Sequence, residues 1–140
     1  MRIILVLLAV LGLAAAALAL REHYRTDASP CSINDRWDCG IVNKSPFAMV
    51  GPVPVAVIGM AGYVLLGILA LTRAYRLLLA AAVIALGYSL YLARIEKDIL
   101  GVWCIYCVAS LAVISSMALL ALATVIARAV RPRPTTASRG

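Results

Sequence analysis

Long apolar segments separated by short polar connections dominate the pattern of hydrophobic and polar positions along the chain. The apolar segments cover residues 3–20, 50–71, 77–93 and 102–127. Each is close to the ~17–25 residues that a helix needs to cross the hydrocarbon layer of a membrane. The pattern therefore predicts an all-α membrane protein, a four-helix transmembrane bundle that forms one domain over residues 1–127.

The longest connection, residues 21–49, joins the first two predicted helices. Its central stretch "SPCSINDRWDCG" is rich in Ser, Pro, Asn, Asp and Gly, which favour loops and turns over a long helix. Pro52 and Pro54 stand at the start of the second apolar segment. Because proline is tolerated in the first turn of a helix, we expect regular helix to begin near Pro54.

Composition and charge support a membrane location. The chain of 140 residues is 64% hydrophobic and only 14% charged, outside the range of ordinary soluble domains. Its net charge of +7 is unevenly distributed. One predicted side of the membrane carries basic residues and no acid: Arg2, Arg73, Arg76, Arg128, Arg131, Arg133 and Arg139.

On the other side, six basic residues balance six acids: Arg21, Arg25, Arg36, Lys44, Arg94 and Lys97 against Glu22, Asp27, Asp35, Asp38, Glu96 and Asp98. Because cytoplasmic loops collect Lys and Arg, both termini are expected to be cytoplasmic and the 21–49 loop extracytoplasmic. This distribution accounts for the net charge without a nucleic-acid partner. Residues 128–140 are expected to form a basic, disordered cytoplasmic tail.

One alternative remains open for the first apolar segment. The first apolar segment could be a cleaved signal peptide, since Ala17-Leu18-Ala19 resembles a small-residue cleavage site. The predicted spans contain no Asp or Glu, which argues against a small proton-coupled exporter. There is also no GxGxxG, P-loop, HExxH or EF-hand motif.

The stretch "GVWCIYCVAS" places Cys104 and Cys107 at the outer end of the fourth predicted helix. Residues three apart share a helix face, with Cα atoms roughly 5 Å apart, a separation that a disulfide accepts. Unpaired N–H groups in the first turn would stabilise a thiolate, mostly that of Cys104. The pair is therefore expected to cycle between dithiol and disulfide.

Cys31 and Cys39 lie in the loop on the same predicted side. A loop pair beside a helical pair suggests a relay in which thiol–disulfide exchange passes two electrons between the pairs. With no flavin, haem or nicotinamide fingerprint, a lipid-soluble quinone is the acceptor that fits. Two alternatives stay open: the cysteines are structural disulfides, or all four form a tetrathiolate metal site.

The stretch "CSINDRWDCGIVNKS", the Pro- and Gly-marked second helix and the later "CIYC" resemble the bacterial members of the vitamin K epoxide reductase family. This resemblance implies that Cys107 faces a quinone and that Cys104 exchanges with the loop. It implies that Cys39 is the loop cysteine that reacts with Cys104, and that Cys31 meets an external partner. Ser45 matches the loop serine of the family and would give polar support.

Two departures from the family pattern shape the functional expectation. Vertebrate members use an Asn and a Tyr to hydrogen-bond the quinone or epoxide, and Val55 and Leu111 stand at these positions here. This favours oxidation of protein thiols over epoxide reduction. Many bacterial members carry a fused thioredoxin-like domain after the last helix. The resemblance here covers residues 1 to about 127 and includes no such domain. The expected partner is a separate thioredoxin-fold, DsbA-like protein.

The expected quinone pocket lies near the outer leaflet. Its candidate residues are Ser45, Phe47, Val55, Tyr88, Tyr91 and Leu111. The Tyr residues could equally belong to an aromatic belt at headgroup level. The function expected from the sequence is a multi-pass inner (cytoplasmic) membrane oxidoreductase that oxidises its partner and reduces menaquinone or ubiquinone. The alternative is a small membrane protein whose cysteines bind metal or brace the loop.

Overall fold

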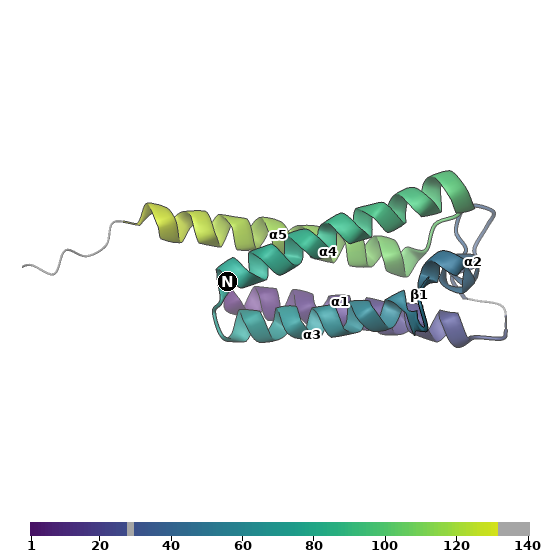
Figure 1. The fold of residues 1–140 in the computed structure, drawn as a ribbon, viewed down its shortest axis with the longest axis horizontal. Coiled ribbons are helices and arrows are strands. Elements are labelled where there is room, and N and C mark those ends of the chain that lie inside the picture. The colour runs from purple at the N-terminus through teal and green to yellow at the C-terminus, as the bar shows by residue number, and fades with distance from the viewer. Residues whose placement is uncertain (28–29, 132–140) are drawn as a thin grey trace, which may run out of the picture.

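Four long helices lie side by side in the computed structural model, which describes residues 1–27 and 30–131 (Figure 1). They are α1 (Arg2–Tyr24), α3 (Val55–Leu71), α4 (Tyr75–Ile95) and α5 (Ile105–Val130). Helix α1 packs against α3 and α5, and α4 packs against α5 and α3. Apart from Arg128–Arg131, the predicted disordered tail lies outside the described residues.

Three stretches of the described chain are long and apolar enough to cross a membrane, judged by length and composition. They are Arg2–Tyr24, Tyr75–Leu100 and Ile105–Val130. Helix α3 is also apolar but has 17 residues, which corresponds to roughly 26 Å at the rise of an α-helix. The chain is thus mostly helical, with three candidate spans and one shorter apolar helix.

The connection between α1 and α3 holds several short elements. They are α2 (Cys39–Lys44), the 3-10 helix η1 (Pro46–Ala48), and the strands β1 (Met49–Val50) and β2 (Val53–Pro54). The strands pair antiparallel around a turn in which Gly51 has φ +60°, a conformation that favours glycine. Helix α3 begins directly after Pro54, as predicted, but residues 50–54 form this hairpin rather than helix.

The connection between α4 and α5 differs from the prediction. Helix α4 continues as the π-helix η2 (Glu96–Leu100) and stops at Gly101, which has φ +68°. Helix α5 starts at Ile105, so the expectation that Cys104 lies within its first turn is wrong. Cys104 is the N-cap residue, with extended backbone, and only Cys107 lies in the first turn.

Longer helices also change the environment of two acids. Helix α1 reaches Tyr24 and η2 prolongs α4, so Glu22 and Glu96 belong to helices instead of the expected loops. Both side chains are buried, with 2% and 4% of their surface exposed. The predicted spans themselves contain no acid, but the longer helices of the structure add these two and the exposed Asp98.

The core between the four long helices is mostly apolar, but a polar contact joins α3 and α5 within it. Leu5, Leu66, Leu78, Ile114 and Met117 are among its buried side chains. The hydroxyl of Tyr63 on α3 donates to the backbone oxygen of Ser110 on α5 at 3.0 Å and lies 2.7 Å from its Oγ. Across from it, Gly12 of α1 leaves space for the Tyr63 ring. This contact joins α1, α3 and α5.

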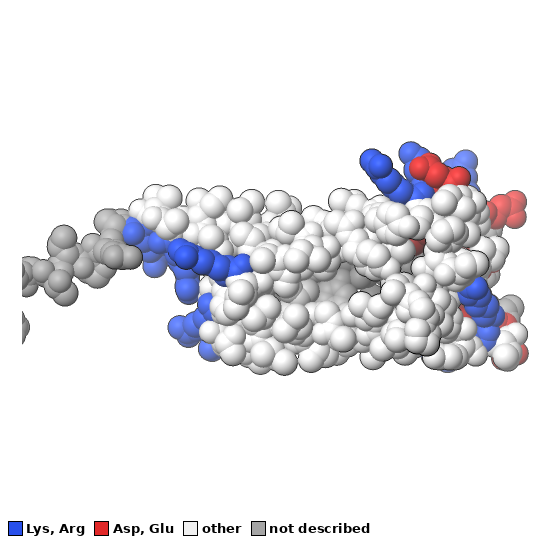
Figure 2. Space-filling view, viewed as in Figure 1, with Lys and Arg blue, Asp and Glu red and all other residues white. Residues whose placement is uncertain are grey.

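Charged side chains gather at the two ends of the helices, and the middle of the face shown in Figure 2 is white, without charged residues. The end that holds the N-terminus and the last turn of α5 shows Lys and Arg only, whereas the opposite end shows both signs. The segments with cysteines lie at the end with both signs, where α2 and the hairpin are found.

Candidate functional site

Cys31 and Cys39 form a disulfide, with their Cα atoms 5.5 Å apart. Both residues are buried, with exposed fractions of 4% and 0%. Cys39 is the first residue of α2, and Asp38 caps this helix by accepting from the N–H of Ile41 at 3.1 Å. An Asp at this position stabilises a short helix because it satisfies a free N–H group. The loop cysteine Cys39 is thus fixed on a capped helix.

The loop is joined to the segment before α5 by backbone hydrogen bonds. Trp103 N–H donates to Arg36 O at 2.7 Å, and Asp38 N–H donates to Trp103 O at 3.0 Å. This parallel bridge pairs Trp37 with Trp103. Cys39 follows Trp37 by two residues, and Cys104 directly follows Trp103. The backbone register therefore brings the loop pair and the helical pair to the same place, and both cysteines lie in one buried cluster.

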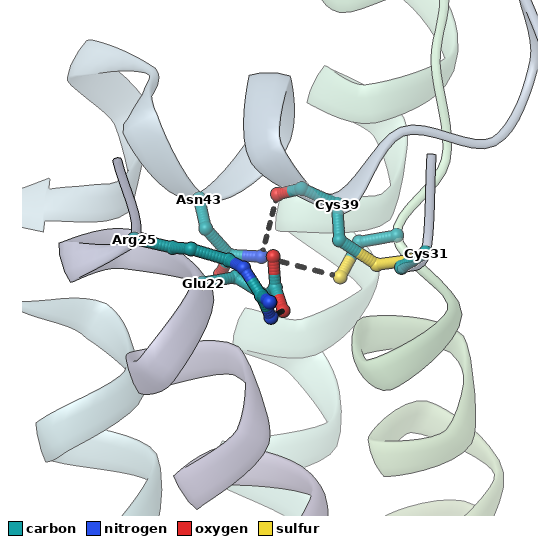
Figure 3. Close-up of polar contacts among 6 residues, drawn as sticks. Glu22, Arg25, Cys31, Cys39 and Asn43 are labelled. Carbon is teal, nitrogen blue, oxygen red and sulfur yellow. Dashed lines mark hydrogen bonds and ion pairs between the residues drawn. A yellow bond between two sulfur atoms is a disulfide. The ribbon is translucent and has the colours of Figure 1, made fainter. Parts of the chain in front are cut away.

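Asn43 of α2 connects the two cysteine pairs. Its Nδ2 donates to the backbone oxygen of Cys39 at 2.8 Å and to Sγ of Cys104 at 3.3 Å. Its own backbone oxygen accepts from Nδ1 of His23 at the end of α1. Figure 3 shows the Asn43 side chain next to Cys39, with Glu22 and Arg25 close by. Helix α2 is in this way attached to both α1 and the CxxC segment.

Cys104 and Cys107 are free thiols, one buried and one half-buried. The hydrogen bond from the Cys107 thiol lowers the pKa of Cys104, an effect that burial opposes and the Asn43 amide reinforces. A lowered pKa favours the thiolate, the nucleophile in disulfide exchange. The structure therefore holds an oxidised loop pair against a reduced helical pair whose first cysteine is prepared for exchange.

Glu96 is an acid of the site that the sequence did not indicate. Its Oε2 accepts from the backbone N–H of Cys104 at 3.2 Å, and its carboxyl interacts electrostatically with the Cys107 thiol. In the sequence it is one of three charges in "RIEKDILG" and nothing distinguishes it from Asp98. Only the π-helical continuation of α4 turns it inward.

Asn43 was also missed, because its position in "CGIVNKS" does not reveal which face of α2 is buried. A second buried acid, Glu22, pairs with Arg25 at 3.5 Å beside the loop. Trp37 and Trp103 supply the backbone bridge described above.

A cavity of about 650 Å³ borders the CxxC segment. All four long helices and the loop contribute to its walls, which are mostly apolar. Cys107, Glu96, Asn43 and His23 are among the polar residues that line it. The space-filling view shows a hollow between the upper and lower helices near the cysteine end (Figure 2). The cavity thus places the second cysteine of the CxxC next to an apolar space.

Most of the expected pocket residues line this cavity: Ser45, Phe47, Val55, Tyr88 and Leu111. Tyr91 does not line it; its ring is 55% exposed and stacks on Tyr88 at 6.1 Å between centroids. The Ser45 hydroxyl donates to the Val42 backbone oxygen at 2.8 Å and so supports the last turn of α2. Binding roles for these residues remain predictions.

The state of the cysteine sulfur atoms bears on the alternative that all four cysteines form a metal site. Metal ligation uses deprotonated cysteine sulfurs, and the two loop sulfurs are bonded to each other. Within residues 1–27 and 30–131, no three His, Cys, Asp or Glu side chains are grouped as a metal site requires. The arrangement instead suits exchange between a disulfide and a dithiol.

The family model described as "Vitamin K epoxide reductase family" matches residues 3–122. A search of curated proteins finds no match. The matched range contains all four cysteines, Glu96, and the four long helices apart from Arg2 and the last residues of α5.

Proposed function

The chain belongs to the vitamin K epoxide reductase family, and from this membership we propose that it is a membrane oxidoreductase that forms disulfides in a protein partner and passes the electrons to a quinone. Family membership itself points to a membrane thiol–disulfide oxidoreductase. The observation that carries the finer proposal is the closed Cys31–Cys39 disulfide held against the reduced Cys104.

The electron path begins at the loop. A dithiol of the partner, a separate thioredoxin-fold protein similar to DsbA, reduces the Cys31–Cys39 disulfide through Cys31. The freed Cys39 thiolate attacks Cys104 in the Cys104–Cys107 disulfide, and Cys31 then displaces Cys104 from Cys39. The electrons then rest on the reduced CxxC, which is the state of the described structure. Because both loop sulfurs are buried, contact with the partner requires the loop to open.

The cavity supports a quinone as the final acceptor. Its volume of about 650 Å³ lies within the range of roughly 300–1,000 Å³ typical of sites for small molecules. Its walls combine apolar side chains with the polar groups of Ser45, Tyr88 and Cys107. A bound quinone would supply a two-electron acceptor there. The residues present therefore fit such a ligand, whether menaquinone or ubiquinone.

The cavity also has a route to lipid. Ile58 and Leu65 of α3 and Ile84 and Tyr88 of α4 line it and are at the same time exposed on the outer surface. These side chains place an opening between α3 and α4 on the apolar face. A lipid-soluble ligand would enter there without crossing water.

The charge distribution supports the proposed orientation. The basic end without acids would face the cytoplasm, and the cysteine end would face the extracytoplasmic side. In this orientation α3 forms the fourth span and the chain is an inner-membrane protein with both termini inside. The products of the reaction, protein disulfides, would form outside the cytoplasm.

Variants of single cysteines test the proposal. Purified protein should reduce a soluble quinone analogue with either a small dithiol or a reduced thioredoxin-fold protein as donor. Cys31→Ala and Cys39→Ala should lose turnover with the protein donor but keep it with the small dithiol, which can reach the CxxC through the half-buried Cys107 at the cavity. Cys107→Ala should lose both. Equal residual activity in the three variants would contradict a relay.

The zinc content of the same preparations separates the proposal from its alternative. We expect protein purified under reducing conditions to carry no stoichiometric zinc and to reduce quinone. Stoichiometric zinc without quinone reduction would instead show that the cysteines bind metal. Absence of both activities, with a stable loop disulfide, would indicate a structural role.

A further inference from the structure

We propose that Glu96 is the catalytic base that removes the proton of Cys107 when the Cys104–Cys107 disulfide closes, and the acid that returns it when this disulfide opens. The inference deepens the proposed function and rests on it for the biological role of the step. The chemistry itself concerns only the CxxC and its neighbour. It can therefore be tested without a quinone.

The geometry singles out this carboxyl group. Oε2 of Glu96 is 3.2 Å from the backbone nitrogen of Cys104, so the carboxyl is fixed at the start of α5. The same carboxyl interacts electrostatically with the thiol of Cys107 in the first turn of α5. Only 4% of the Glu96 surface is exposed, and Glu96 and Cys107 line the same cavity. Contact with the reacting thiol is the first requirement for a general base.

Few other groups could take the proton. Cys104 is the other sulfur of the forming bond, and its lowered pKa makes it a poor proton acceptor. Across the cavity lie His23 of α1, whose Nδ1 is hydrogen-bonded to Asn43, and Tyr88 of α4. Helix α2 contributes the neutral Asn43. Within the described residues no Lys or Arg pairs with Glu96, and Arg94, Lys97 and Asp98 on its own segment are exposed.

Closure of the Cys104–Cys107 disulfide starts from a mixed disulfide between Cys104 and the sulfur of another molecule. The S–H bond of Cys107 breaks and its proton moves to the Glu96 carboxylate. The Cys107 sulfur attacks Sγ of Cys104, the new S–S bond forms, and the departing thiolate leaves with the electron pair of the old bond. In the reverse direction the thiolate of Cys39 opens the disulfide, and Cys107 leaves and takes the proton back from Glu96.

The closing reaction can be timed directly in the purified full-length protein. Because Cys104 is buried under the loop, oxidised glutathione reacts with its thiolate when the loop opens, and Cys107 then closes the disulfide and releases glutathione. Glu96→Gln keeps an oxygen for the Cys104 N–H but cannot accept a proton. Because general bases contribute about 10²–10⁴-fold, closure should slow about a hundredfold or more at neutral pH. Alkylation of Cys104 should stay within about threefold of wild type, which shows that the first sulfur is undisturbed.

Matched variants and the pH profile complete the test. Asp98→Asn removes the same charge two residues away on an exposed position and should close at the wild-type rate. Closure in Glu96→Gln should rise steadily with pH, because hydroxide then has to remove the proton, whereas the wild-type rate changes little around neutrality. Glu96→Asp keeps a displaced carboxyl and should close at an intermediate rate with the pH profile of wild type.

Three results would overturn the inference. The first is closure in Glu96→Gln at the wild-type rate and pH profile. The second is a parallel loss of closure and Cys104 alkylation, which would show a purely structural role. If Glu96→Gln does not fold, Glu96→Ala takes its place, and closure in Glu96→Ala at the wild-type rate and pH profile decides against Glu96. Failure of wild-type protein to reduce quinone would refute the proposed function and leave this result standing.

Discussion

At the scale of the residue, Asn43 determines the environment of the reacting sulfur. Its amide donates to Sγ of Cys104 and to the backbone oxygen of Cys39. A donor that faces a thiolate stabilises the charged form, and the second hydrogen bond keeps the first turn of α2 in place. One side chain thus supports both the reactivity of Cys104 and its alignment with the loop disulfide.

The lowered pKa of Cys104 predicts how its reactivity depends on pH. In wild type, alkylation of Cys104 should reach half of its maximal rate below the ordinary cysteine value of about 8.5. Asn43→Ala removes a donor to the thiolate, so the midpoint should move to higher pH. Ile41→Ala, an exposed change on the same helix, should leave it in place. Peptide mass spectrometry that resolves Cys104 from Cys107 measures this, and coincident curves for all three proteins would refute the role of Asn43.

The sequence predicted these cysteines but not their polar neighbours. The spacing of Cys104 and Cys107 and the turn-rich loop around Cys39 are local features, which a sequence displays directly. Asn43 and Glu96 acquire their roles only because α2 and η2 turn them toward the same sulfur atoms. Such contacts between segments about 60 and eight residues apart depend on packing that no local pattern encodes.

At the scale of the element, the packing of α1 on α3 requires a residue without a side chain. A Cβ atom at Gly12 would lie 2.1 Å from a ring carbon of Tyr63. The ring cannot swing away freely, since its hydroxyl is held by Ser110 of α5. Gly12 therefore permits the contact that joins three helices below the cysteine site.

Gly12→Ala should destabilise the helix packing. Overpacking of a filled core typically costs about 1–3 kcal/mol, and here the Tyr63–Ser110 hydrogen bonds would be lost as well. Gly87→Ala is the matched control, because no atom lies within 4 Å of the added Cβ and alanine favours a helix. Denaturant unfolding in detergent micelles compares them. Equal stability of the two variants would show that the Tyr63 ring yields without cost.

Helix boundaries were predictable where a residue dictates them. Pro54 was expected to precede the second long helix, and it does. The ends of α1 and α4 were placed too early, because Arg21–Tyr24 and Glu96–Leu100 are polar or mixed in character yet continue the helices. These segments were predicted as loops from their polar composition, but they are helical and bury the side chains of Glu22 and Glu96.

At the scale of the whole molecule, charge and chemistry are separated along the helix axes. The purely basic end and the cysteine end lie at opposite ends of the molecule (Figures 1 and 2). The sequence predicted this separation, because it follows from the order of charges along a chain that reverses direction at each connection. The cavity was not predictable as a volume, since its walls come from all four long helices and the loop.

The disulfide trapped in Cys107→Ala tests the relay most directly. Without Cys107, the Cys104 thiolate can only attack the neighbouring loop disulfide, and its position beside Cys39 selects that sulfur. Trypsin cleaves after Arg36 and so separates Cys31 from Cys39. Mass spectrometry of non-reduced, alkylated peptides should then show Cys39 linked to Cys104 and Cys31 alkylated. A Cys31–Cys104 link, or an intact Cys31–Cys39 disulfide with Cys104 always free, would contradict the transfer of electrons between the two pairs.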